Sequence, residues 1–483
     1  MAEKTVVLYP SLGVGHLNPM VQLAKAFVRR GVAVTIAVVD PPGKDPVLEA
    51  AVARLASASP SITVRLLPIK PAGTNDHCSN PALRMLDELR LASPVLREFL
   101  ISLPAVDAIV VDMFCIDALD VAAELAVPAY MFYASAAADL AIYLQVPDVC
   151  RAAPSSFKDM GDTALPFSGV PPVRALDMPD TMADRESELC RRRVQQLARM
   201  PEARGILVNS FEWLESRAVK ALRDGLCASG GRSTPQIYCI GPLVDGGVSG
   251  DSGERHACLE WLDRQRKQSV VFLCFGSGGV FSAAQLREMA GGLENSGHRF
   301  LWAVRSPREE QSQSAGPDLE ALLPHGFLQR TGDRGLVLKD WAPQAEVLRH
   351  EAVGAFVTHC GWNSALEAVM SGVPMICWPL YAEQRLNKVH LVEEMKLGVV
   401  VEGYDYEESS VKAEEVQAKV RLVMESEEGR KLRERAAMAR DMAADAVKEG
   451  GSLDVAFYAF LKHVEMDKLE ERQIRPSDKP PMM

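Results

Sequence analysis

The sequence predicts an α/β protein of two doubly wound domains, each a parallel sheet covered by helices on both faces. Short apolar runs alternate with segments whose apolar residues recur at helical spacing, which is the pattern of repeated βαβ units. The alternation stops at residues 244–257, a stretch rich in Gly, Asp and Ser, and then starts again. At about 150 residues a domain, 483 residues allow three average domains or two large ones, and the single restart favours two.

The first forty residues form one complete βαβ pattern. Residues 6–9 are a short apolar strand, and the turn at residues 10–15 leads into a helix with apolar positions three and four apart. Gly31 is a helix stop signal, and residues 32–39 are the next strand. The elements expected after this unit are the strand 62–67, the helical stretch 82–102, the strand 108–112, the helix 119–125 and the strand 129–133.

The same alternation predicts a second sheet after the break. The strands expected there are 269–275, 300–304, 336–338, 355–358 and 375–378, with helices at 283–293 and 364–370. Residues 306–318 are polar and predict a surface loop, residues 411–464 predict charged amphipathic helices, and residues 466–483 predict a loosely held tail. The predicted domains are therefore an N-terminal domain at 1–243, a linker at 244–257, a C-terminal domain at 258–455, and a helix end and tail at 456–483 that can return to the N-terminal domain.

Composition excludes several classes of partner. The chain carries 53 basic and 64 acidic residues, and its only dense basic run is residues 191–193, so we expect no nucleic-acid partner. No stretch approaches the ~18 apolar residues of a membrane span, and no apolar signal region follows the first residues. The ten cysteines include no C-x-x-C pair, which favours reduced thiols in the cytoplasm. We expect a soluble monomer. We also expect no bound metal, since the sequence has no D-x-D motif and no clustered His/Cys set.

In the second domain, a strand runs through a Gly turn into a helix at residues 356–364. Ligands of open α/β sheets bind outside the carboxyl ends of the strands, where this turn lies. A helix start offers unpaired N–H groups and a partial positive charge to a diphosphate, and His359 adds a further donor. Asn363 and Ser364 are the N-cap candidates. The pattern alone also fits an ordinary capped helix.

In the first domain, His16 follows the first strand and Asp112 ends the strand 108–112. Both therefore belong to the same rim of one parallel sheet. A carboxylate beside an imidazole fixes the tautomer of the ring and stabilises the imidazolium that forms when the ring accepts a proton. The pair is a candidate general base, although position alone also allows a turn histidine.

The turn before His16 partly imitates a dinucleotide-binding fingerprint. Gly13 and Gly15 match its first two glycines, and Asp40 lies near the position of the ribose-binding acid. Asn18 stands where the third glycine is expected, so the match is incomplete. A nucleotide-dependent oxidoreductase is therefore the weaker alternative.

Residues 341–384 carry a longer and more specific pattern. The fixed spacing of Trp341-Ala342-Pro-Gln344, His359-Cys-Gly-Trp-Asn-Ser364, Glu367 and Glu383-Gln384 resembles the donor-binding signature box of plant family-1 UDP-sugar-dependent glycosyltransferases. Gly15-His16, residues 205–211, residues 241–243 and residues 275–277 also resemble family landmarks. The resemblance covers nearly the whole chain and implies a GT-B fold, in which two Rossmann-like domains face each other across a cleft.

The resemblance assigns the start of the box to the nucleoside. Trp341 would stack on uracil, a kind of contact worth about 1–3 kcal/mol per base. Ala342 belongs to the same binding run, and Gln344 would help to hold the nucleoside. Glu367 would accept hydrogen bonds from both ribose hydroxyls, as one carboxylate can.

The resemblance assigns the rest of the box to the diphosphate and the sugar. Gln384 favours glucose, because some galactosyl enzymes of the family carry His at this position. The residues expected on the diphosphate are Ser277, His359, Asn363 and Ser364. The residues expected on the sugar hydroxyls are Trp362, Glu383 and Gln384.

The resemblance makes His16 and Asp112 the catalytic pair of an inverting transfer. The expected reaction moves glucose from UDP-glucose, a substrate rather than a cofactor, to a hydroxyl of a flavonoid or other plant phenolic, and gives a β-glucoside. The acceptor would be lined by parts of residues 70–90, 113–114, 133–148 and 180–200. Galactosyl transfer, attack by carbon instead of oxygen, and a UDP-sugar-binding protein that does not transfer remain open alternatives.

Overall fold

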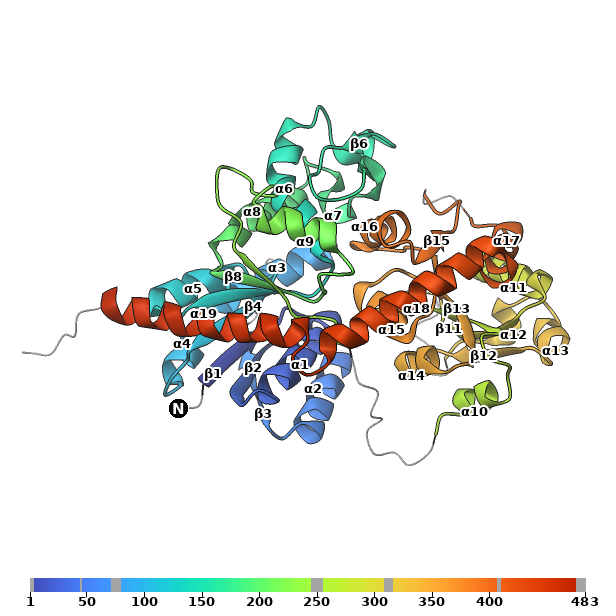
Figure 1. Cartoon of the computed structure of the whole chain (residues 1–483), viewed down its shortest axis with the longest axis horizontal. Helices are drawn as coiled ribbons and strands as arrows, with labels where there is room; N and C mark the ends of the chain where they lie inside the picture. The colour runs from blue at the N-terminus through green and yellow to red at the C-terminus, as the bar shows by residue number, and fades with distance from the viewer. Residues whose placement is uncertain are drawn as a thin grey trace, which may run out of the picture.

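The computed structural model describes residues 4–43, 46–70, 80–244, 255–307, 316–405 and 410–474. Over these residues the chain forms two parallel sheets, one in each half, with helices packed around both (Figure 1). This arrangement confirms the predicted fold class of two Rossmann-like domains. Of the predicted linker 244–257, residues 245–254 lie outside the described residues, and so do residues 308–315 of the predicted loop 306–318.

The N-terminal sheet has the strand order β3-β2-β1-β4-β5-β8-β9 among the described residues. Its order reverses between β1 and β4, which pair in parallel with Tyr9 beside Val111. The two chain segments that leave this point lie together at the carboxyl edge of the sheet. The strands are β1 (Lys4–Tyr9), β2 (Val32–Asp40), β3 (Ile62–Pro68), β4 (Ala108–Asp112), β5 (Ala129–Tyr133), β8 (Gly205–Val208) and β9 (Gln236–Cys239).

The C-terminal sheet has the order β12-β11-β10-β13-β14-β15 in the described part of the chain. It reverses in the same way, here between β10 and β13. A small antiparallel pair, β6 (Ala164–Leu165) and β7 (Val173–Arg174), stands apart from both sheets. The strands of the second sheet are β10 (Val270–Cys274), β11 (Arg299–Val304), β12 (Gly335–Lys339), β13 (Val353–Thr358), β14 (Met375–Cys377) and β15 (Gly398–Val400).

Helices connect the strands of both sheets. The N-terminal helices are α1 (Val14–Val28), α2 (Pro46–Ala58), α3 (Pro81–Leu91), α4 (Ser93–Ser102), α5 (Asp117–Leu125), α6 (Ala137–Ala152), α7 (Asp180–Ala183), α8 (Glu188–Arg199) and α9 (Ser216–Arg223). The C-terminal helices are α10 (Ala257–Asp263), α11 (Ala283–Ser296), α12 (Leu319–Leu322), α13 (Phe327–Thr331), α14 (Gln344–Arg349), α15 (Trp362–Ser371), α16 (Gln384–Val389), α17 (Ala413–Glu425), α18 (Glu427–Val447) and α19 (Ser452–Ile474). No helix among the described residues is long and apolar enough to cross a membrane.

Most predicted strands match the structure to within a few residues. The helical stretch 82–102 is confirmed and consists of two helices, with Ala92 between them and a proline at the start of α4. Two local predictions are wrong. Helix α15 begins at Trp362 with Gly361 as its N-cap, so Asn363 and Ser364 lie inside the first turn and do not cap it. The predicted tail is helical as far as residue 474, because α19 packs on a folded surface. Strands β8, β9 and β15 are short and were not predicted.

Helix α19 leaves the C-terminal domain and lies along the N-terminal domain (Figure 1, red). Its Phe457 and Phe460 are fully buried in one cluster with apolar residues of β1, β2, β4 and α1. The Phe460 ring centroid lies 4.8 Å from that of Tyr130 and 5.5 Å from that of Tyr238. Tyr130 also donates a hydrogen bond to Asp467 on the same helix, at 2.6 Å. The last helix of the chain therefore completes the core of the first domain.

We predict that Phe460→Ala destabilises the N-terminal domain by about 3–5 kcal/mol, since it removes a fully buried ring that contacts the rings of Phe27, Tyr130 and Tyr238. Tyr458→Ala is the matched control on the same helix, because Tyr458 is 79% exposed. The control should change the free energy of unfolding by less than about 0.5 kcal/mol. Urea denaturation followed by circular dichroism measures both variants. Equal stabilities of the two would contradict the packing described here.

Candidate active site

His16 and Asp112 meet where the order of the first sheet reverses. Gly13 turns the chain between β1 and α1 with a φ of 90°, a conformation that favours glycine. The turn brings His16 Nδ1 to 2.9 Å from Asp112 Oδ2. Because a carboxylate can only accept hydrogen bonds, Nδ1 carries the proton and Nε2 is the nitrogen left to act as a base. The Asp112 side chain is 1% exposed and that of His16 is 30% exposed.

The surroundings of His16 raise its pKa above the ordinary value. Burial alone lowers it, but the charge of Asp112 and the hydrogen bond to Asp112 outweigh burial. The Glu383 carboxylate adds to this effect, and the Arg193 cation opposes it. Glu383 belongs to the C-terminal half, so the catalytic candidate of one domain lies within electrostatic reach of the donor box in the other.

His359 lies at the equivalent position of the second sheet, directly after β13 and beside the start of α15. Its ring fills the space next to two glycines, since a Cβ on Gly276 or Gly361 would come within 2.7 Å of Nε2. Burial lowers the pKa of His359 to about 4, and Nδ1 is buried with no partner among the described residues. His359 is therefore a neutral donor. It stands next to a helix start whose first N–H groups are not capped by a side chain, which is the usual setting of a bound phosphate.

The residues expected on the nucleoside follow β12, begin α14 and lie within α15. Gln344 Nε2 donates to Ser364 Oγ at 2.8 Å and to Glu367 Oε2 at 2.7 Å. The structure thus joins Gln344 and Glu367, which are 23 residues apart. Ser364 is bound to the same Gln344 amide, so the three side chains form one hydrogen-bonded group. Trp341 follows β12 and is 59% exposed, whereas Ala342 beside it is buried. So large an exposed aromatic surface leaves the ring accessible for stacking on a base.

The residues expected on the sugar lie where the two domains touch. Trp362 donates its indole N–H to the carbonyl of Asn209 at 2.7 Å, so its side chain reaches the end of β8 and its backbone N–H remains at the helix start. Gln384 Oε1 accepts from the N–H groups of Leu380 and Tyr381 at 2.9 and 3.0 Å, which orients the amide. Glu383 Oε1 lies 3.3 Å from Ser135 Oγ.

Burial and the nearby Asp139 carboxylate raise the pKa of Glu383. A buried ion pair and a buried hydrogen bond join the same segment to the N-terminal domain. Lys388 Nζ lies 2.9 Å from Asp177 Oδ1, and His390 Nε2 lies 3.0 Å from Asp139 Oδ1. The sequence did not point to these pairs, since their members are more than 200 residues apart.

Ser277 and Asn363 make fewer contacts than the other predicted residues. Ser277 is exposed on the loop after β10, and its carbonyl accepts a hydrogen bond from Arg305. Arg305 also donates to the carbonyl of Asp340 at 3.2 Å, so it links the Ser277 loop to the Trp341 loop. Sequence reasoning missed Arg305, although its place just after β11 puts it at the carboxyl edge of the sheet. Asn363 is half-buried in the first turn of α15.

Two Rossmann-like domains, with a buried histidine and an uncapped helix start in one and a His-Asp pair in the other, define a nucleotide-sugar-dependent transferase. A profile of the family described as UDP-glucoronosyl and UDP-glucosyl transferase matches residues 101–428. The chain belongs to this family and is a UDP-glycosyltransferase. The family match replaces the oxidoreductase alternative, and the Gly13-Val-Gly15 turn positions His16 beside Asp112.

Curated relatives and solved structures agree with this assignment. Anthocyanidin 5,3-O-glucosyltransferase of a Rosa hybrid cultivar is 43% identical, and the match covers 94% of this chain and 97% of that one. Phloretin 2'-O-glucosyltransferase of Pyrus communis is also 43% identical, over 92% of this chain and 96% of its own. UGT2 of Phytolacca americana, complexed with UDP-2fluoro-glucose and pterostilbene, has a TM-score of 0.83 and 32% identity over 95% of this chain and 99% of its own. These matches confirm the GT-B fold.

We predict that the pKa values of the two site histidines are shifted in opposite directions from the ordinary value of 6.5. Nuclear magnetic resonance of protein with labelled histidine rings should show His16 titrating above this value. His359 should stay neutral from pH 8 down to about pH 5, because burial opposes its charge. Spectra of His16→Gln and His359→Gln assign the two signals. A midpoint between pH 6 and 7 for His359 would contradict the buried environment described here.

Proposed function

We propose that this enzyme transfers glucose from UDP-glucose, with inversion, to a hydroxyl group of a flavonoid or related plant phenolic. The observation that carries the proposal is the His16–Asp112 pair, which lies within electrostatic reach of Glu383 in the donor box. A base and the donor's sugar are both needed at the point of transfer. In this proposal the base comes from the N-terminal domain and the sugar-binding residues come from the C-terminal domain.

In the proposed reaction, His16 Nε2 accepts the proton of the acceptor hydroxyl while that oxygen attacks the anomeric carbon. The bond from this carbon to the diphosphate oxygen breaks, and UDP leaves with the bonding electrons. Asp112 holds the tautomer that leaves Nε2 free and stabilises the imidazolium that forms. A single displacement inverts the anomeric centre, so an α-linked donor gives a β-glucoside.

The donor residues keep the roles that the resemblance implies. Trp341 stacks on uracil, Gln344 and Glu367 hold the nucleoside, and Gln384 and Glu383 bind the sugar. His359 and the N-terminus of α15, with Ser277, Asn363 and Ser364, stabilise the charge of the departing diphosphate. We assign this charge stabilisation to fixed donors and require no metal ion for it.

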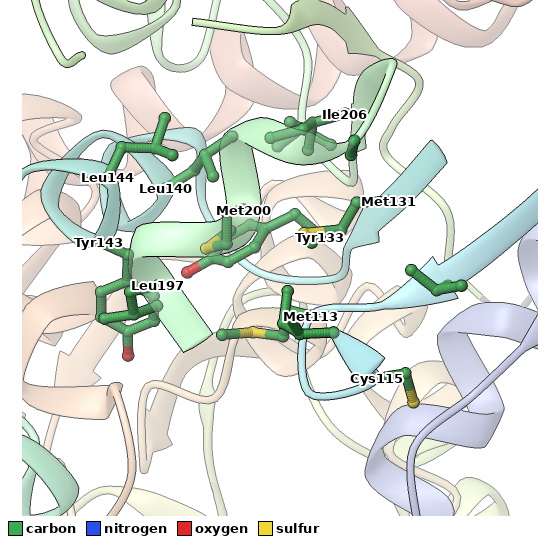
Figure 2. Packing of buried hydrophobic residues seen from close by; sticks show 14 of the residues in the cluster. Met113, Cys115, Met131, Tyr133, Leu140, Tyr143, Leu144, Leu197, Met200 and Ile206 are labelled. Carbon is green, nitrogen blue, oxygen red and sulfur yellow. The ribbon is translucent and has the colours of Figure 1, made fainter. Parts of the chain in front are cut away.

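The proposed acceptor is lipophilic because the region beside the catalytic pair is apolar. Figure 2 shows Met113, Tyr133, Tyr143 and Leu197 packed together from the loop after β4 and from β5, α6 and α8. The relatives support a phenolic acceptor, since their names include an anthocyanidin and phloretin, and one solved structure holds pterostilbene. We also propose a monomer in the cytoplasm, where the nine described cysteines would stay as free thiols.

We predict that the enzyme glucosylates phenolic aglycones and prefers UDP-glucose to UDP-galactose. The test is a panel of flavonoids, dihydrochalcones, stilbenes and simple phenols with each donor, read by mass spectrometry. Proton coupling at the anomeric position of the product identifies the β-glucoside. Comparable turnover with UDP-galactose would overturn the donor assignment, and an α-linked product would overturn inversion.

We predict that His16→Ala loses about 10²–10⁴-fold in kcat, because general-base assistance is worth about that much. The variant should bind UDP as tightly as the original enzyme, because the nucleotide contacts lie in the other domain. Calorimetry with UDP and single-turnover product formation separate the two effects. His298→Ala is the matched control, since among the described residues the His298 side chain pairs with Glu425 of the C-terminal domain. Turnover of His16→Ala near that of the control would exclude His16 as the base.

A further inference from the structure

Arg193 on α8 is a buried cation beside the catalytic pair that the proposed mechanism does not use. Its side chain is 3% exposed, and it forms no ion pair among the described residues. Its Nη1 donates to Gln196 Oε1 at 2.6 Å, while Nε is buried with no partner in the described structure. A buried charge without a counter-ion is costly, so it is retained only where something else depends on it.

Arg193 and Gln196 together hold Phe114. The guanidinium carbon of Arg193 lies over the Phe114 ring, 4.1 Å from its centroid. Gln196, which Arg193 binds, donates from Nε2 to the Phe114 carbonyl at 3.2 Å. One residue is therefore fixed at both its ring and its backbone by neighbouring turns of the same helix.

Phe114 in turn contacts both members of the catalytic pair. Its backbone N–H donates to Asp112 Oδ1 at 3.0 Å, which leaves Oδ2 for His16. Its ring meets the His16 ring edge to face, with centroids 5.2 Å apart and planes at 88°. A shift of Phe114 would therefore rotate the carboxylate and the imidazole at once.

Arg193 also acts on His16 through its charge. Three charged groups influence His16 from the elements around it, namely Asp112 on β4, Glu383 before α16 and Arg193 on α8. The two carboxylates favour the protonated ring, and the Arg193 cation lowers the pKa of His16 against them. Burial lowers the pKa of Arg193 itself, and the nearby Tyr143, Tyr133 and Asp112 act in the opposite direction. The guanidinium stays protonated at any pH used for an assay.

We propose that Arg193 is a positioning residue for the transfer: with Gln196 it fixes Phe114 against the His16–Asp112 pair, and its charge keeps His16 free to accept the acceptor's proton. The inference rests on the proposed function, because it needs His16 to be the base. It assigns two separable effects to one side chain, a geometric effect through Phe114 and an electrostatic effect through the charge.

The test compares Arg193→Met, Arg193→Lys and Gln196→Met by the pH dependence of kcat/KM with UDP-glucose and a phenol. Arg193→Met should lose about 10–100-fold in kcat through misplacement of the pair, with the KM for UDP-glucose unchanged. The acidic limb of its kcat/KM–pH profile should move to higher pH, because the Arg193 cation that disfavours protonated His16 is gone. Arg193→Lys keeps the positive charge but loses the planar guanidinium that binds Gln196 and covers the Phe114 ring. Its kcat should therefore fall, while the acidic limb of the profile stays in place. Gln196→Met should behave like Arg193→Lys.

Controls separate this inference from a packing defect and from the proposed function. Arg192→Met is the matched control on the same helix, since Arg192 pairs with Asp87 at 2.8 Å. This variant should leave both kcat and the acidic limb of the profile unchanged. If Arg193→Met loses kcat but the acidic limb of its profile does not move, Arg193 has only a packing role and the inference is overturned. The proposed function would still stand in that case, provided that His16→Ala loses transfer. If His16→Ala retains transfer, the proposed function and this inference both fall. If Arg193→Met does not fold, the other two variants decide: kcat values of Arg193→Lys and Gln196→Met equal to that of the unsubstituted enzyme would overturn the inference.

Discussion

The buried contacts between the segment 383–390 and the N-terminal domain are the constraint on which the site depends. A transfer reaction needs the sugar-binding residues of one domain at a fixed distance from the base of the other. Lys388 and His390 meet Asp177 and Asp139 across this boundary, away from water. The Lys388–Asp177 ion pair tolerates little displacement, because separating it leaves each buried charge uncompensated. The His390–Asp139 hydrogen bond is likewise costly to break, because it leaves buried polar atoms without a partner. The pairs thus fix the position of Glu383, which lies at the start of the same segment and next to Ser135.

The two site histidines show how one residue type serves two purposes. His16 has a carboxylate at one ring nitrogen, which raises its pKa, and in the proposed reaction the ring holds the proton of the acceptor. His359 has no such partner and is enclosed by two glycines, so burial keeps it neutral. A neutral ring can donate a hydrogen bond to a diphosphate without adding a charge that must later be given up. The difference follows from what the turn after each strand brings near the ring.

Much of the fold and of the donor site could be predicted from the sequence because their signals are local. Apolar runs reveal buried strands, and the donor residues from Trp341 to Gln384 fall within one stretch of chain. Arg193 shows where this reasoning fails. In the sequence it is the end of a basic run at 191–193, and nothing local distinguishes it from the two arginines before it. In the helix, successive side chains point about 100° apart, so Arg192 pairs with Asp87 near the surface while Arg193 is buried against Phe114.

The same contrast between local and distant contacts separates donor binding from acceptor binding. Most of the proposed donor residues lie in one stretch of chain, 341–384, which follows β12, β13 and β14 in turn, and Ser277 after β10 joins them. The region beside the catalytic pair is assembled from β4, β5, α6 and α8, and a change in any of these elements alters it. His16 and Asp112 themselves are 96 residues apart and are joined only by the topology of the sheet. Two relatives that are each 43% identical to this chain are named for different acceptors, an anthocyanidin in one and phloretin in the other, so a similar overall sequence does not by itself fix the acceptor.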